Sequence, residues 1–276
     1  MSIKIVTDSS SNLLMLDGVD FSSVPLKVII GEREFSDNEA VDLQEMVSLL
    51  QNYTGSSSTS CPSVEDWLHA FGDAEEIFCV TMASTLSGSC STARMARQEY
   101  EAQHPNRRVY LIDSLSMGPE MALMIEYIRD LAVGGMTAPH IYQALMRYKA
   151  RTHLLFSLER LQNGANNGRI RQSVARGIGV LGIRVIGRAS DLGQVEILEK
   201  CRGGKQSRNS LIRHMQELGY SGGRILIAHN ANESGAIDLR EQIRSVFGAV
   251  DVRIRTTRAL CSSYAEQGAL LVGMEC

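Results

Sequence analysis

The sequence predicts an α/β protein in two parts: a mainly parallel-sheet N-terminal domain over residues 1–150 and a second α+β domain with a mixed sheet over residues 151–276. Three observations support this. Apolar β-type runs alternate with helical stretches in the first part, and the second part contains a hairpin-like pair of runs. The charge also changes sign, from 10 Lys+Arg against 20 Asp+Glu to 18 against 11. With 276 residues, 44% of them apolar, the chain can bury the cores of one large or two ordinary domains.

The first part has the rhythm of a parallel sheet wrapped by helices. Strands are expected at 3–6, 24–30, 77–82 and 109–112, and helices at 42–52, after Pro62, from Ser89 and within 118–149. Asp42, followed three residues later by Glu45, indicates a helix start, and Gly134-Gly135 indicates a helix stop.

The second part predicts a mixed arrangement. Strands are expected at 153–158, 183–188, 194–200, 224–229 and 250–256, and helices near 205–218 and 233–247. The turn Asp191-Leu192-Gly193 joins two of these strands into a hairpin. Residues 54–60, Thr-Gly-Ser-Ser-Ser-Thr-Ser, are expected to form a polar loop.

Several functional classes are excluded by composition. No run reaches the roughly 18 apolar residues of a membrane helix, so we expect no stable membrane insertion. The first residues lack a basic-then-apolar signal segment, so we expect a cytoplasmic protein. The overall charge of −3, the few aromatic residues and the lack of a binding motif argue against nucleic acid as a partner.

The cysteine and glycine patterns predict neither a metal site nor a cofactor. The six cysteines form no C-x-x-C pair and are expected to be free thiols. The glycines of 177–182 match G-x-G-x-x-G in letters, but a strand-like segment follows them where a dinucleotide site needs a helix.

Hydroxyl-rich loops follow three of the predicted strands. They are Asp8-Ser9-Ser10-Ser11, Ser84 to Ser89, and Asp113-Ser114. Ligands of parallel sheets bind beyond the carboxyl ends of the strands, so these loops are candidates for one shared site.

The segment Leu86-Ser87-Gly88-Ser89 leads directly into a predicted helix. A helix start presents unpaired N–H groups and a positive dipole end, and a glycine allows a ligand to approach the backbone. Hydroxyl donors without a nearby Lys or Arg suit a carboxylate better than a polyphosphate. The alternative is that Ser87 or Ser89 only caps the helix.

Taken together, these loops resemble the DegV family of bacterial fatty-acid-binding proteins. The matching stretches occur in the family's order: IVTDSSSNL (5–13), VPLKVIIGEREFSD (24–37), TSCPS (59–63), STLSGSCSTA (84–93), VYLIDSLSMG (109–118) and GRI (168–170).

The resemblance implies a two-domain α/β fold that holds one long-chain fatty acid in a tunnel between the domains. It implies that the carboxylate is bound near the mouth by Thr59, Ser87 and the N–H of Gly88, with Ser60 beside them. Arg169 matches the family's arginine near the mouth, although a solvated arginine at a helix end is an equal alternative. The resemblance also implies that the protein is not itself an enzyme and presents the acid to a separate fatty-acid kinase subunit.

The C-terminal segment that contains Tyr264 and Gln267 departs from the family pattern. Tyr264 stands at the position of the family's histidine and Gln267 at that of its proline. A tyrosine still donates one hydrogen bond but forms no cation near neutral pH, so presentation to a kinase is a weaker expectation than lipid binding.

Two other functions remain open at this stage. One is a serine-dependent acyl ester hydrolase with Ser87 as nucleophile, for which the sequence offers no motif that supplies a base. The other is a regulatory lipid-sensing or partner-binding module that uses the basic second half.

Overall fold

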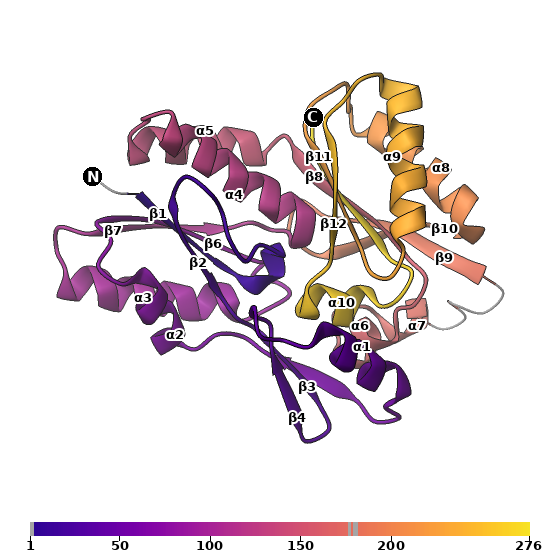
Figure 1. Cartoon of the computed structure of the whole chain (residues 1–276), viewed down its shortest axis with the longest axis horizontal. Coiled ribbons are helices and arrows are strands. Elements are labelled where there is room, and N and C mark those ends of the chain that lie inside the picture. The colour runs from indigo at the N-terminus through magenta and orange to yellow at the C-terminus, as the bar shows by residue number, and fades with distance from the viewer. Residues whose placement is uncertain (1–2, 176–177, 179–181) are drawn as a thin grey trace.

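The computed structural model describes residues 3–175, 178 and 182–276, and it confirms the predicted α/β class (Figure 1). A parallel sheet occupies the first half and a mixed sheet the second, and a small antiparallel sheet lies below their junction in the view of Figure 1. Of the G-x-G-x-x-G stretch, all but Ile178 and Gly182 lies outside the described residues.

The first sheet contains four parallel strands in the order β2-β1-β6-β7, with helices on both faces (Figure 1). Ile5 and Phe78 face one pair of helices, whereas Val6 and Cys79, one residue further on, face the other pair. The strands are β1 (Ile3–Asp8), β2 (Asp20–Val24), β6 (Glu76–Thr81) and β7 (Arg108–Asp113). The first pair of helices is α4 (Gly118–Val133) and α5 (Ala138–Lys149), and the second is α2 (Val64–Phe71) and α3 (Ser89–Gln103).

The mixed sheet has six strands in the order β10-β9-β8-β13-β11-β12. Only its β11–β12 pair is parallel. The strands are β8 (Thr152–Leu158), β9 (Ile183–Ala189), β10 (Val195–Arg202), β11 (Ile225–His229), β12 (Val252–Thr256) and β13 (Leu270–Glu275). Helices α8 (Gly203–Glu217) and α9 (Glu233–Phe247) cover one face, where Leu155, Ile227 and Val272 contribute to the core.

The small sheet corrects two expectations. The strand predicted at 24–30 is wrong as one element: β2 ends at Val24, and β3 (Lys27–Ile30) pairs with β4 (Arg33–Ser36). Pro25, which has no N–H, separates the two strands. The loop predicted at 54–60 is wrong in its second half, because β5 (Ser57–Ser60) pairs with β3 and places Thr59 opposite Val28.

Shorter elements complete the region between the sheets. Helices α1 (Leu43–Asn52) and α10 (Ala259–Ala265) pack on the small sheet around Phe35 and Met46. The remaining elements are η1 (Ser9–Ser11), α6 (Gln162–Asn166) and α7 (Gln172–Ala175).

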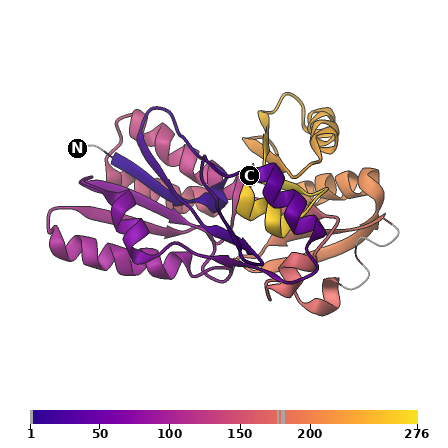
Figure 2. The ribbon, with the colours of Figure 1, turned by 60° about the horizontal axis from the view of Figure 1, so that its bottom comes forward.

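Helix α4 lies between the two large sheets and packs on both of them (Figures 1 and 2). Gly273 of β13 permits this, because a Cβ there would lie 2.4 Å from the backbone nitrogen of Glu120. The division of the chain into domains near residue 150 remains our proposal, supported by the start of β8 at Thr152. Among the described helices, none is long and apolar enough to cross a membrane.

Candidate functional site

A narrow apolar cavity lies between the two halves of the molecule. The space inside it that the centre of a water-sized sphere can occupy is about 80 Å³. The first half contributes Met82, Leu86 and Met117, and the second half contributes side chains from β8, β10, β13 and α10. The latter include Leu154, Phe156, Leu158, Val195, Leu271 and Ala265.

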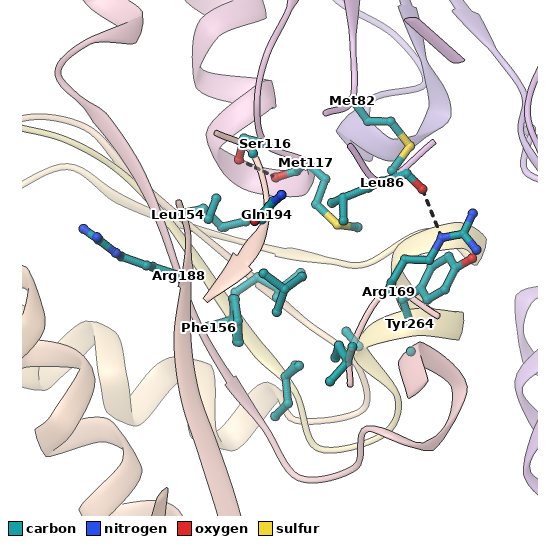
Figure 3. Close-up of a pocket in the computed structure, with 18 residues that line it drawn as sticks. Met82, Leu86, Ser116, Met117, Leu154, Phe156, Arg169, Arg188, Gln194 and Tyr264 are labelled. Atoms are coloured by element: carbon teal, nitrogen blue, oxygen red, sulfur yellow. Dashed lines mark hydrogen bonds between the residues drawn. The ribbon is translucent and has the colours of Figure 1, made fainter. Parts of the chain in front are cut away.

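Leu86, Arg169 and Tyr264 lie together at one end of this cavity, and Arg188 and Leu154 lie toward the other (Figure 3). Arg169 is exposed, and its Nε donates a hydrogen bond to the carbonyl oxygen of Leu86 at 3.1 Å. This contact joins the segment after α6 to the loop after β6. Arg169 is therefore an exposed residue in the lining of the cavity, and its role at a tunnel mouth stays a prediction.

Thr59 and Tyr264, from opposite ends of the sequence, meet at this same end. Their hydroxyl oxygens are 2.7 Å apart, and both side chains are half-buried. Ser60 does not join them: neighbouring residues of a strand point to opposite faces, and the exposed Ser60 hydroxyl donates to the carbonyl of Cys61 at 3.3 Å. Thr59 and Tyr264 are thus brought together as candidate donors, and Ser60 is not.

Ser87 and Gly88 form the start of α3. Gly88 occupies the N-cap position without a side-chain cap, and the Ser87 hydroxyl oxygen accepts a hydrogen bond from the N–H of Ser89 at 3.2 Å. Ser87 therefore performs part of the capping role, while its hydroxyl hydrogen remains available to a ligand.

The loop at Gly88 lies against the segment that follows Thr59. A Cβ on Gly88 would be 3.1 Å from the Sγ of Cys61. The sequence reasoning did not single out Cys61, although it lies inside the TSCPS stretch. The two loops that the resemblance marked as carboxylate ligands are thus neighbours in space.

The three hydroxyl-rich loops do share one edge of the parallel sheet, but they do not all face the cavity. The N–H of Met82 donates to Asp8 Oδ2 at 2.9 Å, and the N–H of Ser84 donates to Asp113 Oδ1 at 3.2 Å. Asp8 and the serines at 9–11 are buried, none more than 2% exposed, so the expectation that this loop binds ligand is wrong. Burial raises the pKa of Asp8, partly offset by hydrogen bonds from Ser10, Ser89 and Met82.

The Ser87 hydroxyl is hydrogen-bonded to the backbone of its own loop. Within the described part of the chain, no histidine or carboxylate is hydrogen-bonded to Ser87. His229, at the end of β11, instead accepts a bond from the N–H of Asn232 at 3.4 Å. Burial lowers the pKa of His229. Across the described residues, no group of three or more His, Cys, Asp or Glu side chains is placed to hold a metal ion.

Comparison with known proteins gives consistent matches over the full chain. A family model described as "Uncharacterised protein, DegV family" matches residues 2–275. A DegV domain-containing protein of Streptococcus pneumoniae strain R6 is 37% identical over 279 residues, covering 100% of this chain and 99% of the relative.

Two solved structures are similar to this one throughout. The S. pneumoniae Fatty Acid Kinase (Fak) B3 protein loaded with linoleic acid has a TM-score of 0.97 and 37% identity, covering 100% of this chain and 99% of that one. A DegV family protein of Eubacterium eligens loaded with heptadecanoic acid also has a TM-score of 0.97 and 37% identity, with 99% of both chains covered. The family model, the identity and the coverage together show that this chain belongs to the DegV family.

Proposed function

We propose that this protein binds one long-chain fatty acid in the cavity between its halves and is not itself an enzyme. The carboxylate lies at the end marked by Leu86 and Tyr264, where the hydroxyls of Thr59, Tyr264 and Ser87 and the N–H of Gly88 are the donors. The observation that carries the proposal is the apolar cavity lined by Leu86 and Tyr264: Ser87 directly follows Leu86, and the Thr59 hydroxyl lies 2.7 Å from that of Tyr264. The relatives loaded with linoleic and heptadecanoic acid support the same ligand class.

The two ends of the ligand contribute differently to affinity. Each buried methylene contributes roughly 0.8 kcal/mol, so about ten of them contribute on the order of 8 kcal/mol before ordering costs. Hydrogen bonds to a charged group contribute about 1.5–3 kcal/mol each, and an unpaired buried charge is costly. The chain therefore supplies affinity, and the hydroxyls supply selectivity for acids.

The cavity must widen to accept a long chain. A water molecule needs roughly 10–15 Å³ on this measure, so a space of 80 Å³ holds only about five to eight water-sized groups. Met82 and Met117 line the cavity and have flexible, unbranched side chains that adapt to an irregular neighbour. We infer that the acyl chain displaces these side chains as it enters.

Binding of labelled palmitate tests the head-group assignment. Ser87→Ala and Thr59→Val each remove one hydrogen bond to the carboxylate, so each is expected to weaken binding about 10- to 150-fold with little change in thermal unfolding. Ser84→Ala and Ser58→Ala are matched controls on the same loop and strand, and both should retain wild-type affinity. Native mass spectrometry should show the purified protein with an adduct of fatty-acid mass. Failure of the wild type to bind palmitate or oleate would overturn the proposal, and wild-type affinity in both variants would overturn the site.

We further propose that the protein acts in the cytoplasm and presents its bound acid to a separate kinase subunit. The name of the pneumococcal relative, a Fatty Acid Kinase B3 protein, supports the partner. The six free cysteines suit a reducing compartment. Incubation of the palmitate-loaded protein with a bacterial fatty-acid kinase subunit and ATP should consume ATP in proportion to bound palmitate. Equal consumption with and without the loaded protein would contradict the presentation role.

A further inference from the structure

We infer that two buried aspartates, Asp8 and Asp37, are positioning residues. They hold in place the elements that carry the proposed carboxylate donors. Asp8 holds the loop that carries Ser87, and Asp37 holds the helix that carries Tyr264. The inference rests on the proposed function, because it explains how the proposed donors are kept in place.

Asp8 fixes the loop after β6 through both of its carboxylate oxygens. Oδ2 accepts hydrogen bonds from the N–H of Met82 at 2.9 Å and from the hydroxyl of Ser89 at 2.6 Å. These residues flank Ser87 on either side. Oδ1 accepts from the N–H of Ser10 at 3.2 Å and from its hydroxyl at 2.5 Å. The carboxylate thus ties both ends of the Ser87 loop to the end of β1.

Asp37 performs the equivalent role for α10. It is 1% exposed, and its two oxygens accept hydrogen bonds from the N–H groups of Ala259 and Leu260, each at 3.0 Å. These are the first two residues of α10, where free N–H groups need acceptors. Tyr264 lies near the end of the same helix, so Asp37 sets the position from which Tyr264 meets Thr59.

The two aspartates are connected through the 3-10 helix η1. Ser9, which directly follows Asp8, accepts a hydrogen bond at its side-chain oxygen from the N–H of Leu26 at 3.0 Å, and the carbonyl oxygen of Leu26 accepts one from the N–H of Asp37 at 2.8 Å. The carbonyl of Ser10 accepts a bond from the Cys261 thiol at 3.3 Å, and Asn12 Oδ1 accepts from the N–H of Arg258 at 2.8 Å. The loop excluded above as a ligand therefore joins the two carboxylate-binding elements.

Asparagine is the informative substitution because it keeps the shape but replaces one acceptor with an NH₂ donor. At either position that NH₂ group faces a backbone N–H or a hydroxyl hydrogen that needs an acceptor. The element it held is expected to shift, and the donor on that element shifts with it.

The experiment compares an acid with an alcohol of equal length. Asp8→Asn and Asp37→Asn should each weaken palmitate binding about tenfold, while 1-hexadecanol binding changes less than about threefold, because only the acid needs aligned donors for a charge. Ser89→Ala, a milder change, removes one bond to Asp8 and should weaken palmitate binding about threefold. Asp42→Asn, which alters the exposed cap of α1, and Asp20→Asn, at an exposed position of β2, are the controls and should match the wild type.

Double variants show which donor each aspartate serves. Asp8→Asn should cost little further affinity in a Ser87→Ala background, and Asp37→Asn should cost little further in a Tyr264→Phe background, whereas the crossed pairs should be additive. Equal loss of acid and alcohol binding, or full additivity in all four pairs, would overturn the positioning role. If the wild type binds palmitate and the Ser87→Ala variant binds it equally well, the head-group site itself is refuted.

Discussion

At the scale of single residues, the contact between Tyr264 and Thr59 determines which hydroxyl hydrogens remain free at this end of the cavity. The Tyr264 hydroxyl lies 2.7 Å from that of Thr59, so one of the two hydroxyls donates to the other. The remaining hydrogen is then free for a carboxylate oxygen. The start of α3, with its free N–H groups and positive dipole end, lies beside the segment that follows Thr59, and among the described residues no Lys or Arg side chain is hydrogen-bonded to Thr59.

Tyr264→His should introduce a pH dependence into palmitate binding. A histidine at this position gains a proton as the pH falls through about 6.5, and the cation attracts the carboxylate. The variant should bind palmitate about three- to tenfold more tightly at pH 6 than at pH 8, relative to the wild type measured in parallel. Titrations of both proteins at these pH values provide the test. Parallel pH profiles would show that residue 264 does not contact the head group.

At the scale of an element, the first turn of α4 carries an unusual buried carboxyl group. Glu120 is 6% exposed and accepts a hydrogen bond from the Thr152 hydroxyl at 2.9 Å. Burial raises the pKa of Glu120 to about 7, against the smaller opposing effects of Ser116, Thr152 and Lys149. The group lies where α4 meets β8 and β13, the contact that Gly273 makes possible.

Glu120→Gln should flatten the pH dependence of stability. The folded protein holds the Glu120 proton more tightly than the unfolded chain does. The stabilisation that the protonated Glu120 contributes is therefore complete below pH 4.5 and is lost as the pH rises through about 7. The loss amounts to about 3 kcal/mol of unfolding free energy in the wild type, and glutamine keeps the bond from Thr152 without titrating. Urea unfolding between pH 5 and about pH 8 measures it. Glu99→Gln, on the exposed face of α3, is the control. If the unfolding free energy of Glu120→Gln depends on pH as strongly as that of the wild type, Glu120 is not the group that titrates.

The elements that the sequence predicted are those whose pattern is local. Alternation and helix signals located β1, β6, β7 and the helices around them, whereas the edge strand β2 was not predicted. Asp42 caps α1 through the N–H of Glu45, as its spacing indicated. Strand β5 was not predicted because its four polar residues show no alternation of apolar and polar side chains, and only their pairing with β3 makes them a strand. Helix α10 and strand β13 were likewise not predicted, since β13 is apolar on both faces and its place is set by distant partners.

The same distinction applies to the site. Ser87 was predicted as a donor from its loop position and from the family resemblance, and Thr59 from the resemblance alone, whereas the contacts of both residues were not predicted. The 2.7 Å approach of Thr59 to Tyr264 spans 205 residues. The burial of Asp8 and Asp37 depends on how η1 packs against α10, which no local pattern reveals.

At the scale of the whole molecule, ion pairs link α4 to the far edge of the mixed sheet. Glu126 of α4 is 2% exposed and receives Arg253 at 2.6 Å and Arg255 at 3.0 Å, both from β12. A second link joins Asp130 of α4 to Arg224, just before β11, at 2.7 Å. Helix α4 therefore packs on both sheets and is also bound to the mixed sheet by ion pairs.

Replacing both Arg253 and Arg255 by methionine should leave Glu126 buried and unpaired. Breaking such a pair costs about 3–5 kcal/mol of unfolding free energy. Trp67, the only tryptophan, lies in the first half, so its fluorescence during urea unfolding shows whether damage in the second half reaches the first. Arg240→Met, which removes an exposed pair with Glu241, should cost less than about 1 kcal/mol. If the double variant does not change the urea midpoint of the Trp67 fluorescence transition, the two halves unfold separately.

The position of β13 has a consequence for how the molecule is made. This strand, at residues 270–275, fills the centre of its sheet between β8 and β11. A nascent chain that has emerged only as far as Gln267 has both neighbouring strands but a gap between them, with the backbone groups of each left without their ladder partners. Prematurely terminated copies would therefore expose two unpaired strand edges, which are templates for aggregation and targets for chaperones and proteases.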